Sequence, residues 1–222
     1  MESRAVRSYK LRGRRITEGQ QEAWDRLWPV FGIEYSAQKI NLAELFPDSK
    51  RIVMEIGFGM GEATAQIAAA DPTTGYLAVE VHRPGIGKLL SRIEELELKN
   101  VRTIEGDAFE VFEQMIADSS LDGVHLFFPD PWPKARHFKR RIVNQEFIAS
   151  VAAKLKPGAF FHIATDWHPY AEWIADEFTK QSFFTGGEVD RPAWRPLTRF
   201  EDQGINKEHP VADFRFTKKV IT

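Results

Sequence analysis

Residues 51–62 read RIVMEIGFGMGE, and this stretch decides the fold class. We expect an apolar strand over 51–56 that ends at Gly57, followed across a short turn by an Ala-rich helix over 62–70. Glycine at Gly57 and Gly59 lets the backbone turn sharply and approach a ligand closely. Many glycine-rich strand–helix turns bind nothing, so the pattern alone leaves the presence of a ligand open.

The rest of the chain repeats this strand–helix unit. Units of this length require right-handed crossovers, which build a parallel sheet covered by helices on both faces. Lys156-Pro157-Gly158 is typical of a helix stop, and 186–207, rich in Gly, Pro and charge, is expected to be a long loop. The expected strands are 76–81, 101–104, 121–128, 159–164 and 212–216, and the expected helices are 17–30, 85–98, 109–117, 144–155 and 169–180.

The domain organisation follows from where the charges fall. Residues 1–16 carry six basic residues and one acid, which predicts either a basic arm that meets a polyanion or a solvated tail. Residues 17–222 contain no internal repeat or linker, so we expect a single domain there.

Composition excludes several classes of protein. There are no cysteines, so disulfides, zinc-thiolate sites and thiol catalysis are absent. No signal sequence and no apolar run of about 20 residues are visible, which favours a cytoplasmic enzyme without a membrane association. The net charge is −2, so any affinity for nucleic acid must come from local patches. No obligate protein partner and no metal-ligand spacing of His or acidic residues are evident.

Four carboxylates fall at or near the ends of the first four strands of the repeated unit: Glu55, Glu80, Asp107 and Asp130. Ligands of open α/β sheets bind at that edge, where the acids would converge. Four acids would repel a pyrophosphate but suit a cofactor that carries positive charge. S-adenosylmethionine, with its ammonium and sulfonium, satisfies the pattern better than NAD, and the Gly-x-Gly-x-Gly spacing also differs from the dinucleotide fingerprint.

Residues 125–141 read HLFFPDPWPKARHFKRR and join an acid to a basic strip. Asp130 lies between two prolines, which limit its backbone freedom. The six basic residues that follow have no acid among them, which indicates contact with RNA phosphates or, alternatively, a solvated helix start. Trp132 either stacks on a base or packs beneath the loop.

With these residues in view, the chain resembles the bacterial tRNA (guanine-N7)-methyltransferases. The matching segments are Glu55–Gly61, Glu80–His82, Phe127–Trp132, Lys134–His137, Lys139–Arg141, Ala164–Trp167 and Thr198–Glu201. The resemblance implies a Rossmann-like class I methyltransferase with a mostly parallel seven-stranded sheet. It also implies S-adenosylmethionine as cofactor, tRNA as partner, and methyl transfer to N7 of guanine 46 in the variable loop.

The resemblance further implies a role for each matching residue, with Asp130 as the proposed catalytic residue. It associates Glu55, Gly57, Gly59, Glu80, Asp107, Ala108 and Asp130 with the cofactor. It associates Lys134, Asp166, Thr198, Arg199, Phe200 and Glu201 with the substrate, and Arg136, His137, Phe138, Lys139, Arg140 and Arg141 with RNA.

Guanine N7 is an acceptor with an in-plane lone pair, so its methylation needs no proton removed from N7. We therefore expect Asp130 to orient the guanine and to stabilise the cation that forms, rather than to act as a base. Two other classes of protein stay open: a nicotinamide-dependent oxidoreductase, and a non-catalytic RNA-binding module. The second would leave the glycine turn and the acids at the strand ends unexplained.

Overall fold

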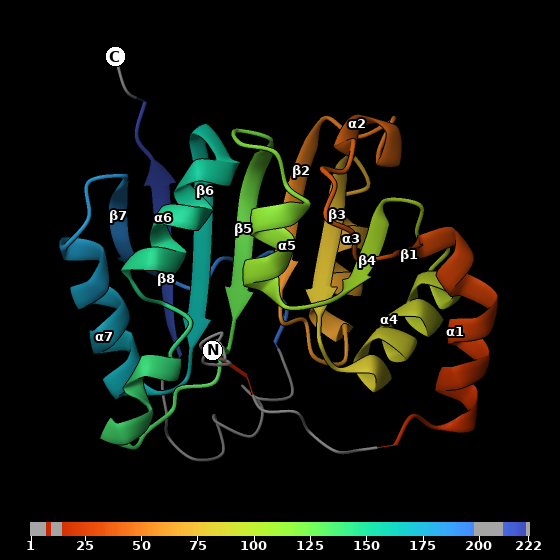
Figure 1. The fold of residues 1–222 in the computed structure, drawn as a ribbon, viewed down its shortest axis with the longest axis horizontal. Helices are drawn as coiled ribbons and strands as arrows, with labels where there is room; N and C mark the ends of the chain where they lie inside the picture. The colour runs from red at the N-terminus through yellow and green to blue at the C-terminus, as the bar shows by residue number, and fades with distance from the viewer. Residues whose placement is uncertain (1–7, 10–14, 198–210, 221–222) are drawn as a thin grey trace.

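The computed structural model describes residues 8–9, 15–197 and 211–220. These residues build one eight-stranded sheet of order β1-β4-β3-β2-β5-β6-β8-β7 (Figure 1). The first six strands in chain order are parallel, and β8 pairs antiparallel with both β6 and β7. The expected α/β class, with a mostly parallel sheet, is confirmed.

The elements alternate between strand and helix through most of the chain. The strands are β1 (Gly32–Ile33), β2 (Arg51–Ile56), β3 (Thr74–Glu80), β4 (Val101–Glu105), β5 (Leu121–Phe127), β6 (Leu155–Thr165), β7 (Phe184–Val189) and β8 (Ala212–Lys218). The helices are α1 (Glu18–Phe31), α2 (Leu42–Leu45), α3 (Glu62–Ala70), α4 (Arg83–Glu95), α5 (Ala108–Gln114), the 3-10 helix η1 (Ala135–Arg140), α6 (Gln145–Lys154) and α7 (His168–Thr179).

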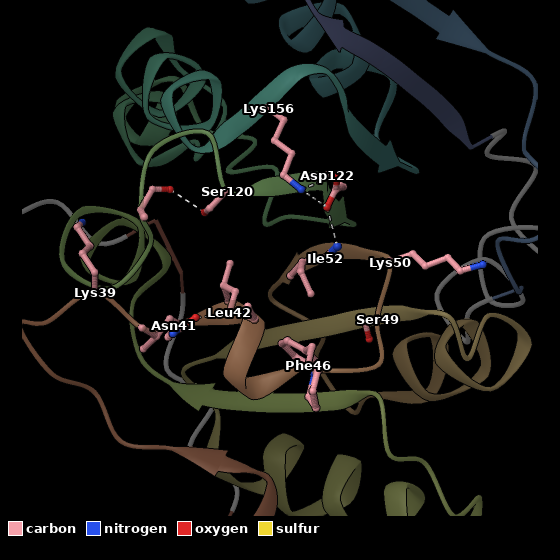
Figure 2. Close-up of a pocket in the computed structure, with 14 residues that line it drawn as sticks. Lys39, Asn41, Leu42, Phe46, Ser49, Lys50, Ile52, Ser120, Asp122 and Lys156 are labelled. Carbon is pink, nitrogen blue, oxygen red and sulfur yellow. Dashed lines mark hydrogen bonds and ion pairs between the residues drawn. The ribbon is translucent and has the colours of Figure 1, made fainter.

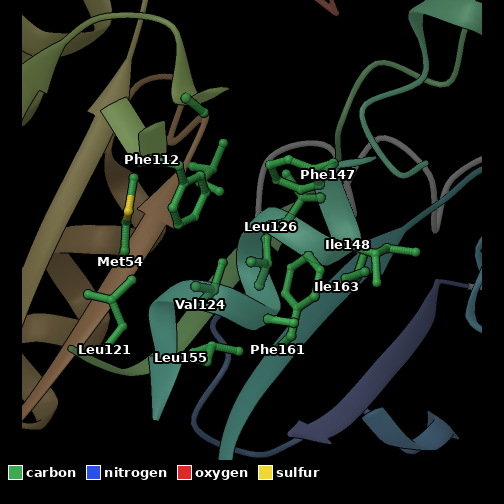
Figure 3. Packing of buried hydrophobic residues seen from close by; sticks show 14 of the residues in the cluster. Met54, Phe112, Leu121, Val124, Leu126, Phe147, Ile148, Leu155, Phe161 and Ile163 are labelled. Carbon is green, nitrogen blue, oxygen red and sulfur yellow. The ribbon is translucent and has the colours of Figure 1, made fainter. Parts of the chain in front are cut away.

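Helices cover both faces of the sheet, and each face has its own hydrophobic core. Side chains of α1, α3 and α4 form one core with β2 and β3. Side chains of α5, α6 and α7 form the other core, where Phe112 and Phe147 pack on Met54, Val124 and Phe161 (Figure 3). Burial on both faces explains why β2 and β5 are nearly continuous apolar runs.

The strand order reverses between β2 and β5. From β2 the chain adds β3 and β4 on one side, and it then returns to add β5 and β6 on the other. The carboxyl ends of β2 and β5 therefore lie side by side at a topological switch point, pointing downward in Figure 1. Open α/β sheets bind their ligands at such a point.

Most expected elements are present, and β2 and α3 have the predicted bounds. Over the described residues the sheet has eight strands rather than seven, because the two residues of β1 add a short edge strand beside β4. The expected loop from residue 186 is wrong for 186–189, since Gly186 and Gly187 lie within β7 and pair with β8. The helix stop at 156–158 lies inside β6, where Gly158 adopts a φ of 80°.

Four residues of the expected basic arm, 8–9 and 15–16, belong to the described part of the chain, and two of them contact the loop after β5. Trp132 Nε1 donates to the carbonyl of Ser8 at 2.8 Å, and Arg140 Nη2 donates to the carbonyl of Tyr9 at 3.3 Å. The arm therefore touches the region just after β5. Among the described residues, no helix combines the length and the apolar character that crossing a membrane requires.

Candidate active site

The turn after β2 is built from three glycines in the left-handed region. Gly57, Gly59 and Gly61 have φ values of 70°, 60° and 69°. No atom lies within 4 Å of the place where a Cβ of Gly57 or Gly59 would be, so this backbone borders open space. Gly85 of α4 has no room for a side chain, because its Cβ would strike the carbonyl of Gly59.

Glu80, at the end of β3, is fixed against this turn. Its Oε2 accepts from the backbone N–H of Gly59 at 2.9 Å. Its Oε1 accepts from the N–H groups of Val81 and His82 at 2.7 and 3.0 Å. These three donors set the orientation of the carboxylate at the carboxyl end of β3, the position from which an acid accepts from a ribose diol in folds of this type.

Glu55 is 2 % exposed, and its Oε2 has no hydrogen-bond partner among the described residues. Burial raises the pKa of Glu55 to about 7, the Thr64 hydroxyl opposes the rise, and the charge of Glu80 adds to it. An unpaired buried carboxylate is costly without a compensating donor or cation. Glu55 therefore fits a positively charged ligand above the glycine turn.

Asp107 has a structural role of its own. It is the N-cap of α5, and its Oδ1 accepts from the N–H of Phe109 at 2.8 Å. The next residue, Ala108, is buried in the first turn of the helix. Both residues lie just beyond β4, on the same edge of the sheet as Glu80, so the predicted cofactor residues do converge there.

Asp130 follows β5 between two residues of unusual conformation. Phe128 and Trp132, neither of them glycine, have φ values of 53° and 43°. Such conformations cost on the order of 1–3 kcal/mol each and persist only where the surroundings enforce them. Strain of this kind clusters at functional sites, and here it flanks a partly buried carboxylate.

Of the two roles left open for Trp132, the structure supports packing beneath the loop. The ring is 4 % exposed. The guanidinium of Arg140 lies 3.7 Å from the ring centroid, and the ring of His137 lies 5.6 Å away. Since the ring is almost wholly covered and its indole N–H is bonded to Ser8, it is not accessible for stacking on a base.

In the 3-10 helix η1, side chains at positions i and i+3 lie above one another. The residues of the basic strip therefore form three rows, each facing a different side. His137 and Arg140 face Trp132. Phe138 and Arg141 face the interior: Arg141 is 3 % exposed, donates to the carbonyl of Pro131 at 3.0 Å and stacks on the Phe138 ring. The third row, Arg136 and Lys139, is exposed, as is Lys134 at the N-cap.

The expected guanine-binding residues divide between described and undescribed parts of the chain. Asp166 directly follows β6 on the carboxyl edge, partly exposed beside Trp167. Thr198, Arg199, Phe200 and Glu201 lie outside the described residues.

A buried polar cluster lies where no sequence motif marks it. Arg195, His162 and Asp213 are all 1 % exposed or less. Hydrogen bonds from His162 and Arg195 lower the pKa of Asp213, although burial alone would raise it. Asp213 lies in β8, where apolar and polar residues alternate, and such alternation does not indicate that a polar residue is buried.

A hollow of about 620 Å³ lies at the opposite, amino edge of the sheet (Figure 2). Its lining includes the apolar Leu42 and Phe46 and the ion pair of Lys156 with Asp122. No acid at the carboxyl end of a parallel strand reaches it. We therefore place the candidate active site at the carboxyl edge, where the predicted residues meet.

The residues present fit S-adenosylmethionine. The glycine turn offers open backbone, Glu80 offers oriented oxygens, and Glu55 offers an unpaired oxygen. Within the described ranges, no group of three or more His, Asp or Glu residues is arranged to hold a metal ion.

Comparison with known proteins bears on the same residues. A family model described as "Putative methyltransferase" matches residues 49–214. A tRNA (guanine-N(7)-)-methyltransferase of Streptomyces avermitilis is 49% identical over 97% of this chain and 76% of its own length. One of Nitrosospira multiformis is 48% identical over 97% of this chain and 96% of its own.

A solved structure supports the fold alone. The 16S rRNA methyltransferase KamB superposes with a TM-score of 0.60 at 15% identity, over 81% of this chain and 93% of that one. The fold is that of the class I methyltransferases. Because a family model matches residues 49–214 and relatives are about half identical across nearly the whole chain, this chain belongs to the tRNA (guanine-N(7)-)-methyltransferase family.

Proposed function

We propose that this chain transfers the methyl group of S-adenosylmethionine to N7 of guanine 46 in the variable loop of tRNA. The observation that carries the proposal is the pair of turns at the switch point. One turn ends β2 with open glycine backbone beside two carboxylates, and the other ends β5 with a fixed Asp130. We infer methyl transfer from membership of the family, and we infer tRNA as substrate and N7 of guanine as the methylated atom from the name of the relatives.

The cofactor half lies at β2–β4. The cofactor, when bound, supplies a methyl group on a positively charged sulfur. The backbone at Gly57 and Gly59 lets it approach closely, and Glu80 accepts hydrogen bonds from the ribose. Glu55 offsets the positive charge of the cofactor, and Asp107 with Ala108 borders the adenine of the cofactor.

The guanine half lies at β5–β6. N7 has a free lone pair, so no residue has to remove a proton. Asp130 holds the guanine in plane with the methyl donor and stabilises the positive charge that develops on the purine. A preorganised group of this kind contributes about 2.7–4 kcal/mol to the transition state. Lys134, Asp166 and residues 198–201 orient the same base.

The phosphate track, by which we mean the residues of 136–141 that contact RNA phosphates, has fewer members than the run of basic residues in the sequence suggests. We assign phosphate contact to Arg136 and Lys139, which are exposed. Arg140, stacked on Trp132, supports them. Arg141 holds the turn from within, since a guanidinium that is 3 % exposed and stacked on Phe138 is turned away from solvent.

The test incubates the full chain with methyl-labelled S-adenosylmethionine and an unmodified tRNA transcript, followed by nucleoside analysis. The label is expected in N7-methylguanosine, and a transcript with adenine at position 46 is expected to receive none. Label in another nucleoside would overturn the N7 assignment, and undiminished labelling of the variant transcript would overturn position 46. Titration with NADH, which is expected to show no binding, addresses the oxidoreductase alternative.

A further inference from the structure

The loop that follows β7 crosses the sheet face opposite to α6 and α7 (Figure 1). Trp194 stacks on His125 of β5, with centroids 5.2 Å apart and planes at 19°. It meets His162 of β6 edge-on at 5.3 Å. The next residue, Arg195, is wholly buried. Two consecutive side chains of this loop thus lie against the central strands.

Arg195 makes a two-pronged ion pair with β8. Its Nε donates to Asp213 Oδ1 at 2.8 Å, and its Nη2 donates to Oδ2 at 2.7 Å. The Nε2 atom of His162 lies 2.7 Å from the same Oδ1, and because a carboxylate only accepts, this nitrogen is the donor. Both oxygens of Asp213 are therefore engaged, and the planar fork of Arg195 has one orientation.

The same guanidinium reaches the end of β5. Its Cζ lies 5.9 Å from the Phe127 ring centroid and 5.6 Å from that of Phe128. Phe128 is the strained residue with a φ of 53°, and Asp130 is two residues further on. Arg195 thus contacts both Asp213 and the turn that carries Asp130.

An ion pair at this depth is a poor source of stability. Burying two charges costs several kcal/mol each, and apolar residues of similar volume often stabilise as well or better. A bidentate pair instead fixes geometry, because the guanidinium fork accepts only one arrangement of its partner. Because Arg195 lies beside Phe128, this pair is placed to fix the conformation of the turn after β5.

We infer that Arg195 is a positioning residue for methyl transfer: its ion pair with Asp213 holds Phe128, and through it the Asp130 turn, in the reactive geometry. The inference rests on the proposed function. It predicts a separation of effects, because Arg195 contacts β8 and the end of β5, and a small misplacement of a reacting group there is enough to cost about 100-fold in rate.

The experiment compares the full-length wild type with Arg195→Met, Arg195→Lys and the double variant Arg195→Met/Asp213→Asn, which removes both charges. Lys154→Met, which removes the partly exposed ion pair with Asp118 near the amino edge, is the matched control. For each protein the midpoint of thermal unfolding, the Kd for S-adenosylmethionine, and kcat and KM on tRNA are measured below the lowest midpoint.

Arg195→Met is expected to lose at least tenfold in kcat and to keep its cofactor Kd within about threefold of wild type. The double variant should regain thermal midpoint without regaining kcat, Arg195→Lys should recover part of kcat, and Lys154→Met should match wild type. A double variant with wild-type kcat would overturn the inference, as would a cofactor Kd that weakens in parallel with kcat. A wild type that forms no N7-methylguanosine would instead reject the proposed function.

Discussion

The two turns at the switch point reach the same left-handed backbone region by different means. After β2, glycines at 57, 59 and 61 adopt it without steric cost. After β5, Phe128 and Trp132 adopt it despite their side chains and are held by buried contacts. The first turn leaves backbone open to a ligand, whereas the second has a strained residue on each side of Asp130, and packing holds both of them.

This difference matches the function proposed for each turn: cofactor binding after β2 and methyl transfer to guanine after β5. A cofactor that is bound and released is served by exposed backbone and an already oriented acceptor such as Glu80. A charge that must stand beside the reacting ring is served by a carboxylate that does not move. Variants in the two turns should therefore separate binding from turnover.

The largest expected effect is on the β5 side. Asp130→Asn keeps the size of the side chain but removes the charge that stabilises the methylated purine. Single-turnover rates on tRNA should fall about 100- to 1,000-fold. Lys154→Met, far from the site, is the control. A rate close to wild type for Asp130→Asn would mean that the strained turn does not aim a reacting group.

On the β2 side, the buried Glu55 should make stability depend on pH. Because burial raises its pKa from 4.5 to about 7, the folded state holds the proton more tightly than the unfolded state. The favourable contribution of Glu55 is therefore complete below pH 4.5 and is lost as the pH rises through about 7. Glu55→Gln avoids this loss, so its free energy of unfolding should gain on wild type by about 3 kcal/mol between pH 4.5 and 8.

Urea unfolding of the ligand-free proteins at several pH values measures this gain. The exposed Glu113→Gln serves as the matched control. A constant difference between Glu55→Gln and wild type across the range would contradict the burial that the structure assigns to Glu55.

Exchanging residue types between the turns should have a smaller effect. Gly59→Ala has space for its methyl group but strains a φ of 60°, at about 1–2 kcal/mol. It should weaken cofactor binding about tenfold, with kcat nearly kept at saturation.

Phe128→Gly is the reverse exchange. It relieves strain but frees the Asp130 turn, so it should lower kcat and leave cofactor binding intact. The reverse pattern, from calorimetry and steady-state kinetics, would reject the division of roles.

The smallest effect concerns the phosphate track. Arg136→Gln/Lys139→Gln removes two exposed cations and should reduce the slope of log affinity for tRNA against log salt by about 1.4–1.8. Filter binding at several salt concentrations measures it. Replacement of the buried Arg141 should instead lower the thermal midpoint. An unchanged slope in the double variant would remove η1 from the RNA interface.

The sequence predicted the repeated unit well because clear stop signals punctuate it. Gly57 ends β2, and Asp71-Pro72 ends α3, where the predictions matched the structure. The strands β1 and β7 escaped prediction for physical reasons: β1 has only two residues, and β7 contains two glycines and depends on pairing with β8. Both are formed by partners distant in sequence rather than by local preference.

The acids at the strand ends were predictable because the carboxyl ends of parallel strands meet at one edge. The state of individual side chains was not. Trp132 is covered by Arg140 and bonded to Ser8, which is 124 residues away. Arg141 is buried because η1 is a 3-10 helix, a detail that a run of basic residues does not reveal.

The division between the turns is tested most directly by titrating S-adenosylmethionine into Glu80→Ala and Asp130→Asn in parallel. Glu80→Ala should weaken the cofactor roughly 10- to 150-fold, from the loss of about 1.5–3 kcal/mol of charged hydrogen bonding. Asp130→Asn should bind it within a few-fold of wild type. Equal weakening in both variants, or an unchanged affinity in Glu80→Ala, would contradict the account.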